Sequence, residues 1–418
     1  MWARVAAVAV SGAVWMGSIP AALSALPEQL PVGLPDFPRR VRRELPQLRP
    51  DQHIHFGILD LHPSFESGVT YDDNIRLAHI DPADDVIFSE RPAIVGEVKF
   101  GNHRVEAGYG TELLTYVKVQ EENTTNHLAH GILELNFNDL HLTASDTMEK
   151  STSRIFSETS ARDHVLFNTI QVLGRYDRPH WASENAWTHN TVDHRTTQFK
   201  VNNYGEDVFS VLGGYKVLPK TLALVEADAG IVNYAHNTSN ADQTYWQIMT
   251  GVRGELGPKI STTVKIGFQG RQLSDVGGQG PHENYEGVVA DMDLTYEPTK
   301  QDTLRAGYVR TVVPSTFGAN NWYRQDRIAV SYRRQLTHKW SVTPHGGWQL
   351  NAYPELSTVA ESTKHRRDNF ALAGASVRYQ VQEWLWATAS YDFRGRSSNL
   401  DALAYDNNRV AVDVTIAF

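Results

Sequence analysis

The chain has 418 residues and a formal net charge of −9, and 41% of its residues are hydrophobic. This acidic balance offers no basic surface for nucleic acid, which is excluded as an expected partner. No interior run of about 20 apolar residues is present, which excludes a protein that crosses a membrane as helices. The chain has 10 Trp, 17 Tyr and 15 Phe, many for a water-soluble protein, and no Cys, which suits passage through an oxidising compartment.

Residues 1–25 have the pattern of a secretory signal peptide, with Arg4 before an apolar stretch and Ala22-Leu23-Ser24-Ala25 as the cleavage region. The cut falls after Ser24 or after Ala25, and an uncleaved membrane anchor is the alternative. Residues 26–52 contain six prolines with arginines between them, which favours an extended periplasmic linker. The alternative for its arginines is contact with anionic head groups, polysaccharide or a periplasmic partner.

From residue 53 to residue 418, strand-like segments alternate with connectors, and short connectors alternate with long ones. The short ones carry residues that favour tight turns. They are Gly101-Asn102, Asn138-Asp139, residues 177–180, 218–220, 257–259, 298–301, 336–339 and 381–383. The long ones are polar and lie near residues 76–85, 118–126, 150–163, 189–204, 235–242, 274–284, 313–321, 355–367 and 397–405. Eight short and nine long connectors separate 18 strands.

The strand-like segments alternate apolar and polar residues, as in residues 260–271, where Ile260, Val264 and Phe268 share one face. The last segment, residues 409–418, carries β-branched residues up to a terminal aromatic without the charges that protect a free edge. A sheet that closes into a barrel in lipid leaves no strand edge unpaired. The alternation of short and long loops is typical of such transmembrane barrels.

The sequence therefore predicts an all-β fold, a transmembrane antiparallel up-and-down β-barrel of about 18 strands over residues 53–418. Short turns are expected on the periplasmic side and long loops outside. A count of 16 strands is the alternative, because the pattern is weakest in residues 163–176 and 181–188. A soluble β-sandwich fits less well, because it has no reason to segregate loop lengths. The aromatic residues beside the short turns are expected to form a periplasmic girdle; they are Tyr176, Trp181, Tyr215, Tyr296, Trp340 and Trp384.

A barrel of 16 to 18 strands is wide enough for an aqueous interior, so transport is the expected activity. Charged residues of the polar faces are expected to line the pore, because Lys or Arg in lipid costs about 2–4 kcal/mol near the midplane. They are Lys216, Glu226, Asp228, Arg253, Lys265, Arg271, Asp291, Asp293, Arg305, Arg327, Arg333, Asp392, Arg394, Arg396, Arg409 and Asp413. Their excess of Arg and Lys would concentrate carboxylate or sulfate groups, as on a uronic-acid polymer. The alternative is that these charges pair across the lumen and simply keep the pore wet.

Two segments resemble a family of bacterial β-barrel porins, several of which belong to exopolysaccharide export loci. The first is Tyr71-Asp72-Asp73-Asn74, within residues 61–75. The second is the C-terminal strand, with Tyr405-Asp406-Asn407-Asn408 at its start and Phe418 at its end. Looser parts of the resemblance are residues 84–88 and Pro92. The resemblance implies a bacterial outer-membrane location and suggests passage of a secreted polysaccharide, and it identifies no catalytic residue.

An enzyme is not expected, and no catalytic residue, metal site or cofactor is predicted. His53 and His55 lie near the barrel start, while His127 and His130 are taken as polar residues of a loop end without a third ligand. Ser160 and Asp163-His164 have no nucleophile elbow beside them.

Two further predictions concern the loops. The acids in residues 72–74 and 81–85 could hold calcium, but they lack the spacing of an EF-hand, so a solvated acidic loop is expected. Gly277-Gly278-Gln279-Gly280 is the most flexible candidate for a gate.

The expected function is a passive outer-membrane channel for export of an exopolysaccharide. Its expected surroundings are outer-membrane lipid and lipopolysaccharide, with periplasmic export components as further partners. Two alternatives stay open. One is a general or solute-specific diffusion porin, and the other is a structural or adhesive surface barrel with a plugged lumen.

Overall fold

The computed structural model describes residues 54–152, 158, 161–235, 240–274, 283–315, 317, 320–360 and 362–418. The predicted signal peptide (1–25) and linker (26–52) lie outside the described residues, as do His53, Ser160 and the glycine segment at 277–280.

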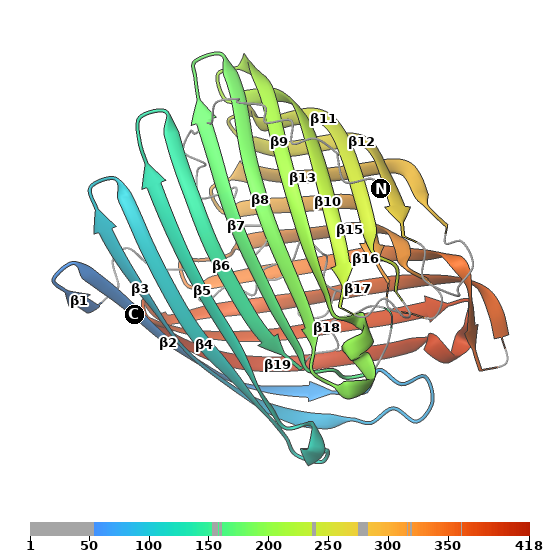
Figure 1. Cartoon of the computed structure of the whole chain (residues 1–418). Helices are drawn as coiled ribbons and strands as arrows, with labels where there is room; N and C mark the ends of the chain where they lie inside the picture. The colour runs from blue at the N-terminus through green and yellow to red at the C-terminus, as the bar shows by residue number, and fades with distance from the viewer. Residues whose placement is uncertain are drawn as a thin grey trace.

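One antiparallel sheet of 19 strands contains every strand of the described residues (Figure 1). Its strands are β1 (Ile54–Phe56), β2 (Leu59–Asp72), β3 (Asp85–Phe100), β4 (His103–Tyr116), β5 (Thr124–Asn136), β6 (Leu140–Ser151), β7 (Val165–Asp177), β8 (Trp181–His194), β9 (Tyr204–Leu218), β10 (Thr221–Tyr234), β11 (Gln243–Gly257), β12 (Ile260–Leu273), β13 (Tyr285–Thr299), β14 (Asp302–Pro314), β15 (Trp322–Gln335), β16 (Trp340–Val359), β17 (Ser362–Gln382), β18 (Leu385–Ser398) and β19 (Tyr405–Ala417). Short 3-10 helices lie in three of the long connectors; they are η1 (Gln120–Glu122), η2 (Thr197–Asn202) and η3 (Asp401–Leu403).

Strands β2 to β19 close a barrel, because each pairs with its sequence neighbours and β19 pairs with β2. The predicted fold class is therefore confirmed, with 18 strands in the barrel and not 16. The short β1 pairs only with the start of β2, below the end of β19. No helical segment in the described ranges is long and apolar enough to cross a membrane.

The short connectors lie where tight-turn residues predicted them, from Gly101-Asn102 between β3 and β4 to the turn between β17 and β18. The prediction is wrong for one of the long connectors. Residues 355–367 were expected to form a loop, but β16 and β17 continue through them, with Leu356 paired to His365 and Val359 to Ser362. Polar residues can extend a hairpin when their side chains find partners. Ser357 and Arg366, on one face of this extension, are 1% and 0% exposed, so polarity alone did not identify a loop there.

The alternation of side chains gives each strand an exterior face and an interior face. In β10, Val225 and Ile231 are 53% and 44% exposed, whereas Glu226 and Asp228 between them are each 6% exposed. We call the face with the exposed apolar residues exterior and the opposite one interior. The same assignment extends around the barrel through the paired registers.

The weak pattern of β7 and β8 has a structural cause, because their exterior faces carry polar side chains that bond to neighbouring strands. Asn168 donates a hydrogen bond to Asp146 at 2.6 Å, and His189 Nδ1 lies 2.9 Å from Asp207 Oδ1. These polar side chains hydrogen-bond to partners on neighbouring strands. The segments therefore form strands although their exterior faces are not uniformly apolar.

Aromatic rings cluster beside the short turns. The rings of Tyr176 and Trp181 lie 5.8 Å apart, and Trp384 stacks on Phe418 with a centroid distance of 5.7 Å. Trp340 packs on Tyr379 at 4.5 Å. These contacts tie the ends of adjacent strands together at the level where a periplasmic girdle is expected.

Candidate functional site in the barrel interior

The predicted pore-lining residues all lie on interior faces, opposite the exposed apolar side chains of their strands. Lys265 and Arg271, for example, alternate in β12 with Ile266 and Phe268, which are 50% and 43% exposed. That these side chains line an open pore remains a prediction, whereas their contacts are described below.

Lys265 is the centre of the most buried charge cluster in this set. Its Nζ lies 3.1 Å from Glu226 Oε2 and 3.1 Å from Asp291 Oδ2, and the residue is 3% exposed. Glu226 belongs to β10, so the ammonium reaches across β11. Gly251 of β11 is paired with Lys265, and its missing side chain leaves that route open.

Several other predicted residues are paired within the interior rather than isolated. Arg253 donates to Glu184 at 2.8 Å, and His345 Nε2 lies 2.8 Å from Asp392. Three further ion pairs of the set join Asp413 to Arg91, Arg409 to Asp72 and Lys216 to Asp177. These pairs join strands that lie at most three apart in the sheet, so the charges pair along the wall. Pairing across the lumen, the alternative interpretation of the sequence, stays a prediction.

The interior charges are segregated into two walls. The first, called the arginine wall, is formed by β14 to β19, where acids are few. It contains Arg305, Arg327, Arg333, Arg366, Arg378, Arg394, Arg396 and Arg409, with Asp368, Asp392 and Asp413. The excess of arginine expected from the sequence therefore belongs to one side of the barrel.

The opposite side, β2 to β10, presents mostly acids and is called the carboxylate wall. It contains Asp60, Glu66, Asp72, Asp85, Glu97, Glu106, Glu112, Glu134, Glu149, Asp177, Glu184, Glu206, Glu226 and Asp228, with Arg91, Lys99, Arg104, Arg175 and Lys216. Most of this wall was missed from the sequence. The even spacing of Arg104, Glu106 and Glu112 in one strand was the available indication of a shared face.

Glu158 connects the two walls. It lies between β6 and β7 and is 1% exposed, yet its carboxylate accepts a hydrogen bond from Ser315, after β14, at 2.5 Å. Its backbone carbonyl accepts another from Arg366 of β17 at 2.7 Å. Since β6 and β7 belong to the carboxylate wall and β17 to the arginine wall, these bonds join the connector residue Glu158 to the other wall.

Glu158→Ala should raise the single-channel conductance, because it removes the side-chain bond to Ser315 that joins Glu158 to the other wall. The measurement is conductance in a planar bilayer. Glu121→Ala is the control, since Glu121 forms an exposed ion pair with Arg76 in the external loops. Equal conductance for the wild type and Glu158→Ala would show that this bond does not narrow the path.

The long connectors are tied to one another at the external end. Ala241 donates its backbone N–H to Asn321 Oδ1 at 2.7 Å, and Gln243 donates to the Asn321 carbonyl at 2.9 Å. Asn320 donates to Ser357 Oγ at 2.9 Å. The external end on this side is therefore a packed polar network.

The motifs that carry the family resemblance meet at the seam where β2 and β19 close the barrel. Asn407 donates to Asp72 Oδ1 at 2.6 Å, and Asn408 donates to Asp73 through its backbone and side chain, both at 2.7 Å. Asn74 donates to the carbonyl of Asp406 at 2.9 Å. These two segments, 72–74 and 406–408, are called the seam clasp.

The expectation of a solvated acidic loop is wrong for the seam clasp and for Asp85. Asp72, Asn74 and Asp85 are 8%, 2% and 0% exposed. The Asp85 carboxylate accepts backbone N–H bonds from Lys118 at 3.0 Å and Val119 at 2.8 Å, so it anchors the next loop. Within the described ranges, no group of three or more His, Cys, Asp or Glu side chains is arranged to hold a metal ion.

The histidines also differ from expectation. His127 and His130 lie within β5, on opposite faces, and not in a loop. His127 Nδ1 lies 2.7 Å from the hydroxyl of Tyr109, and His130 Nε2 lies 2.8 Å from Glu106. Both histidines therefore contact side chains of the neighbouring strand β4.

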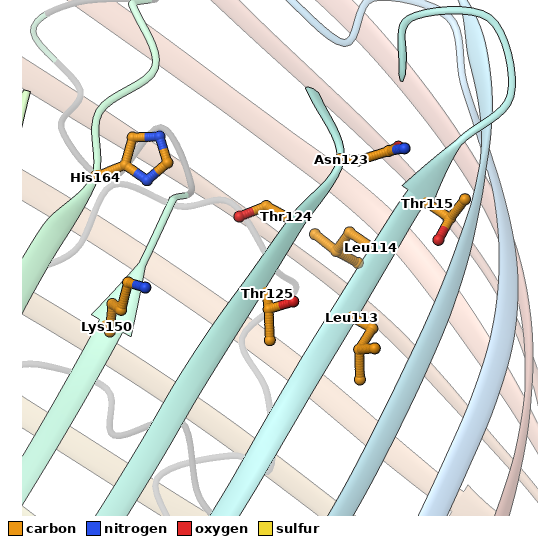
Figure 2. Close-up of a pocket in the computed structure, with 8 residues that line it drawn as sticks. All are labelled: Leu113, Leu114, Thr115, Asn123, Thr124, Thr125, Lys150 and His164. Atoms are coloured by element: carbon orange, nitrogen blue, oxygen red, sulfur yellow. The ribbon is translucent and has the colours of Figure 1, made fainter. Parts of the chain in front are cut away.

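A hollow of about 480 Å³ lies at the external ends of β4 and β5 (Figure 2). It is lined by Leu113, Leu114, Thr115, Asn123, Thr124, Thr125, Lys150 and His164. Leu113, Thr125 and Lys150 belong to exterior faces, whereas Leu114 and Thr124 belong to interior faces. None of the predicted pore-lining residues lines the hollow.

Residues 54–418 match the protein family described as "Putative beta-barrel porin 2". No curated protein sequence matches the chain. Among solved structures, the outer membrane protein OpdK from Pseudomonas aeruginosa has 9% identity, covers 86% of this chain and 99% of its own, and has a TM-score of 0.48. OccAB3 from Acinetobacter baumannii has 10% identity, covers 86% and 99%, and has a TM-score of 0.45. The family match covers the whole barrel, and the chain therefore belongs to this porin family and resides in the bacterial outer membrane.

Proposed function

We propose that the protein is a passive outer-membrane channel for carboxylate-bearing saccharides, with export of a secreted polysaccharide as its role. The observation that carries the proposal is the segregation of interior charge into an arginine wall and a carboxylate wall. Facing walls of opposite sign create a transverse field, which holds anionic groups on one side of the path.

The arginine wall extends along the height of the barrel. Arg333 lies near the short turn that ends β15, Arg327 lies further along the same strand, and Arg396 lies near the external end of β18. A guanidinium binds a carboxylate through two parallel hydrogen bonds. Repeated sites along the path suit a chain that carries a carboxylate on successive sugars, because each group can pass from one arginine to the next.

A solute-specific porin is the second candidate, and a different observation favours it. Glu158 bonds to the opposite wall through Ser315, and Gln325 and Gln349, on the interior faces of β15 and β16, are both 0% exposed. A packed interior of this kind leaves room for small molecules more readily than for a wide polymer.

Replacing Arg305, Arg327 and Arg333 together by Gln should shorten the residence of oligouronates in the channel at least about tenfold. The reason is that each charge-assisted hydrogen bond contributes about 1.5–3 kcal/mol. The measurement is the duration of current blockades in a planar bilayer. Arg334→Gln is the control, because Arg334 lies on the exterior face of β15 and pairs with Asp302.

The same recording separates the candidates by chain length. Blockades that lengthen with the number of uronate units support a polysaccharide conduit. Entry of only mono- and disaccharide acids supports the solute porin, and absence of current indicates a plugged barrel. In cells, deletion should abolish extracellular polysaccharide while small-solute uptake is unchanged. The opposite result removes the export role, and with it the proposed periplasmic export partners.

A further inference from the structure

Three arginines lie on the exterior of the barrel, near the external ends of β14, β15 and β17. In β15, Arg324 and Asp326 share a face with Ile328, which is 44% exposed. Arg310 of β14 is paired with Asp326, so it lies on the same face. Arg367 of β17 joins them through the register of β16, described below. None of the three is among the charged residues predicted to line the pore.

One carboxylate holds two of the guanidiniums. Asp326 Oδ1 accepts from Arg310 Nε at 2.5 Å and from the Tyr308 hydroxyl at 2.9 Å, and Asp326 Oδ2 accepts from Arg324 Nε at 3.2 Å. The Asp326 side chain is 5% exposed, whereas those of Arg310 and Arg324 are 33% and 36% exposed. Both arginines bind through Nε, and in the described part of the chain their terminal nitrogens have no protein acceptor. The cluster carries one net positive charge.

Arg367 adds a second positive charge beside the first. Ala352 of β16 is paired with Arg324 on one side and with Arg367 on the other. The Cα atoms of the two arginines are therefore separated by two strand spacings, about 9.6 Å. Arg367 is exposed, and its guanidinium forms no ion pair within the described ranges. The small side chain of Ala352 leaves open space between the two cations.

The three arginines lie at the height of the outer leaflet of the membrane. Arg310 follows Asp302, the first residue of β14, by eight positions. With the usual strand rise and tilt this places it roughly 20 Å above the short turns, near the top of an apolar band about 25 Å tall. Its exterior neighbour on β13 is Ala290, beside Val288, which is 45% exposed. Uncompensated cations at this level need an anion from the membrane.

We infer that Arg310, Arg324 and Arg367 form a binding site for the phosphate groups of lipopolysaccharide. The outer leaflet presents the phosphorylated glucosamines of lipid A at this height, and guanidinium binds phosphate bidentately. Arg324 and Arg367 contact the phosphate on either side of Ala352, and Arg310 supports it from below. Asp326 fixes two of the arginines and is too buried to meet the lipid.

The inference is tested with the full chain purified in detergent and titrated with bisphosphorylated lipid A, detected by native mass spectrometry. The double variant Arg324→Gln with Arg367→Gln should bind at least tenfold more weakly than the wild type. Arg334→Gln, which changes the same face of β15 at the opposite end, should bind as the wild type does. Arg367→Gln alone, at an exposed position without an ion pair, should give a smaller loss and guards against misfolding of the double variant.

Two further ligands separate the sources of phosphate. The wild type and the double variant should bind dephosphorylated lipid A with equal affinity. Inorganic phosphate at millimolar concentration should not compete with bisphosphorylated lipid A for the wild type. Equal binding of the two lipids would overturn the inference, because acyl chains would then account for it. Competition by inorganic phosphate would also overturn it, since the site would then take free anions. If Arg334→Gln and the double variant lost equal affinity for lipid A, the loss would be a nonspecific effect of removing positive charge, and the inference would be overturned.

Discussion

Lys265→Met should lower the free energy of unfolding of the barrel by about 3 kcal/mol. The ammonium is 3% exposed and lies 3.1 Å from both Glu226 and Asp291. Its removal leaves two carboxylates close together in the interior without their shared cation. The measurement is reversible urea unfolding in detergent or lipid vesicles, followed by tryptophan fluorescence.

Lys216→Met is the matched control, because Lys216 also pairs with an acid, Asp177, but its side chain is 23% exposed. Ion pairs that water reaches contribute about 1 kcal/mol or less. Adding Glu226→Gln to Lys265→Met should recover part of the loss, because it removes one of the repelling charges. Equal losses for Lys265→Met and Lys216→Met would contradict the assignment of Lys265 as a buried bridge.

Asn407→Ala should lower the free energy of unfolding by about 2 kcal/mol, the cost of leaving a buried group without its partner. Asn407 is 0% exposed and donates to Asp72 at 2.6 Å, so the variant loses a bond across the seam that closes the barrel. The checks are urea unfolding and the temperature at which the folded band is lost on a semi-native gel.

Asn399→Ala provides the comparison for the seam. Asn399 also bonds across strands, donating to the His365 carbonyl at 2.8 Å, but the bond is exposed and lies away from the seam. Water can replace it, so the expected loss is below about 1 kcal/mol. If Asn407→Ala unfolds at the same urea concentration as the wild type, the seam clasp does not hold the barrel closed.

The fold was predictable from the sequence where the determinants are local. Tight turns such as Gly101-Asn102 depend on neighbouring residues, and the face of a residue such as Lys265 depends only on its parity along the strand. The loop predicted at residues 355–367 was wrong for a physical reason. In a hairpin that extends beyond the membrane, polar side chains such as Arg366 are buried against other connectors, so the alternation of apolar and polar residues that marks the spanning strands is lost.

The site was less predictable, because its contacts join distant parts of the chain. The sequence identified Tyr71-Asp72-Asp73-Asn74 and Tyr405-Asp406-Asn407-Asn408 separately, but only the closing register shows that they bond to each other. Glu158 gave no indication of its partners Ser315 and Arg366, since loop side chains have no periodicity to follow. The carboxylate wall was missed because acids on an interior face resemble those of any solvated strand.

The pairing of β19 with β2 has a consequence for biogenesis. Asn407 and Asp72 are 335 positions apart, so the circumference is completed only by the last strand of the barrel to be synthesised. Until then the sheet has two bare edges, which are templates for aggregation in water and are not tolerated in hydrocarbon. A copy that lacks β19 would keep both edges unpaired, so we expect it not to form a stable barrel.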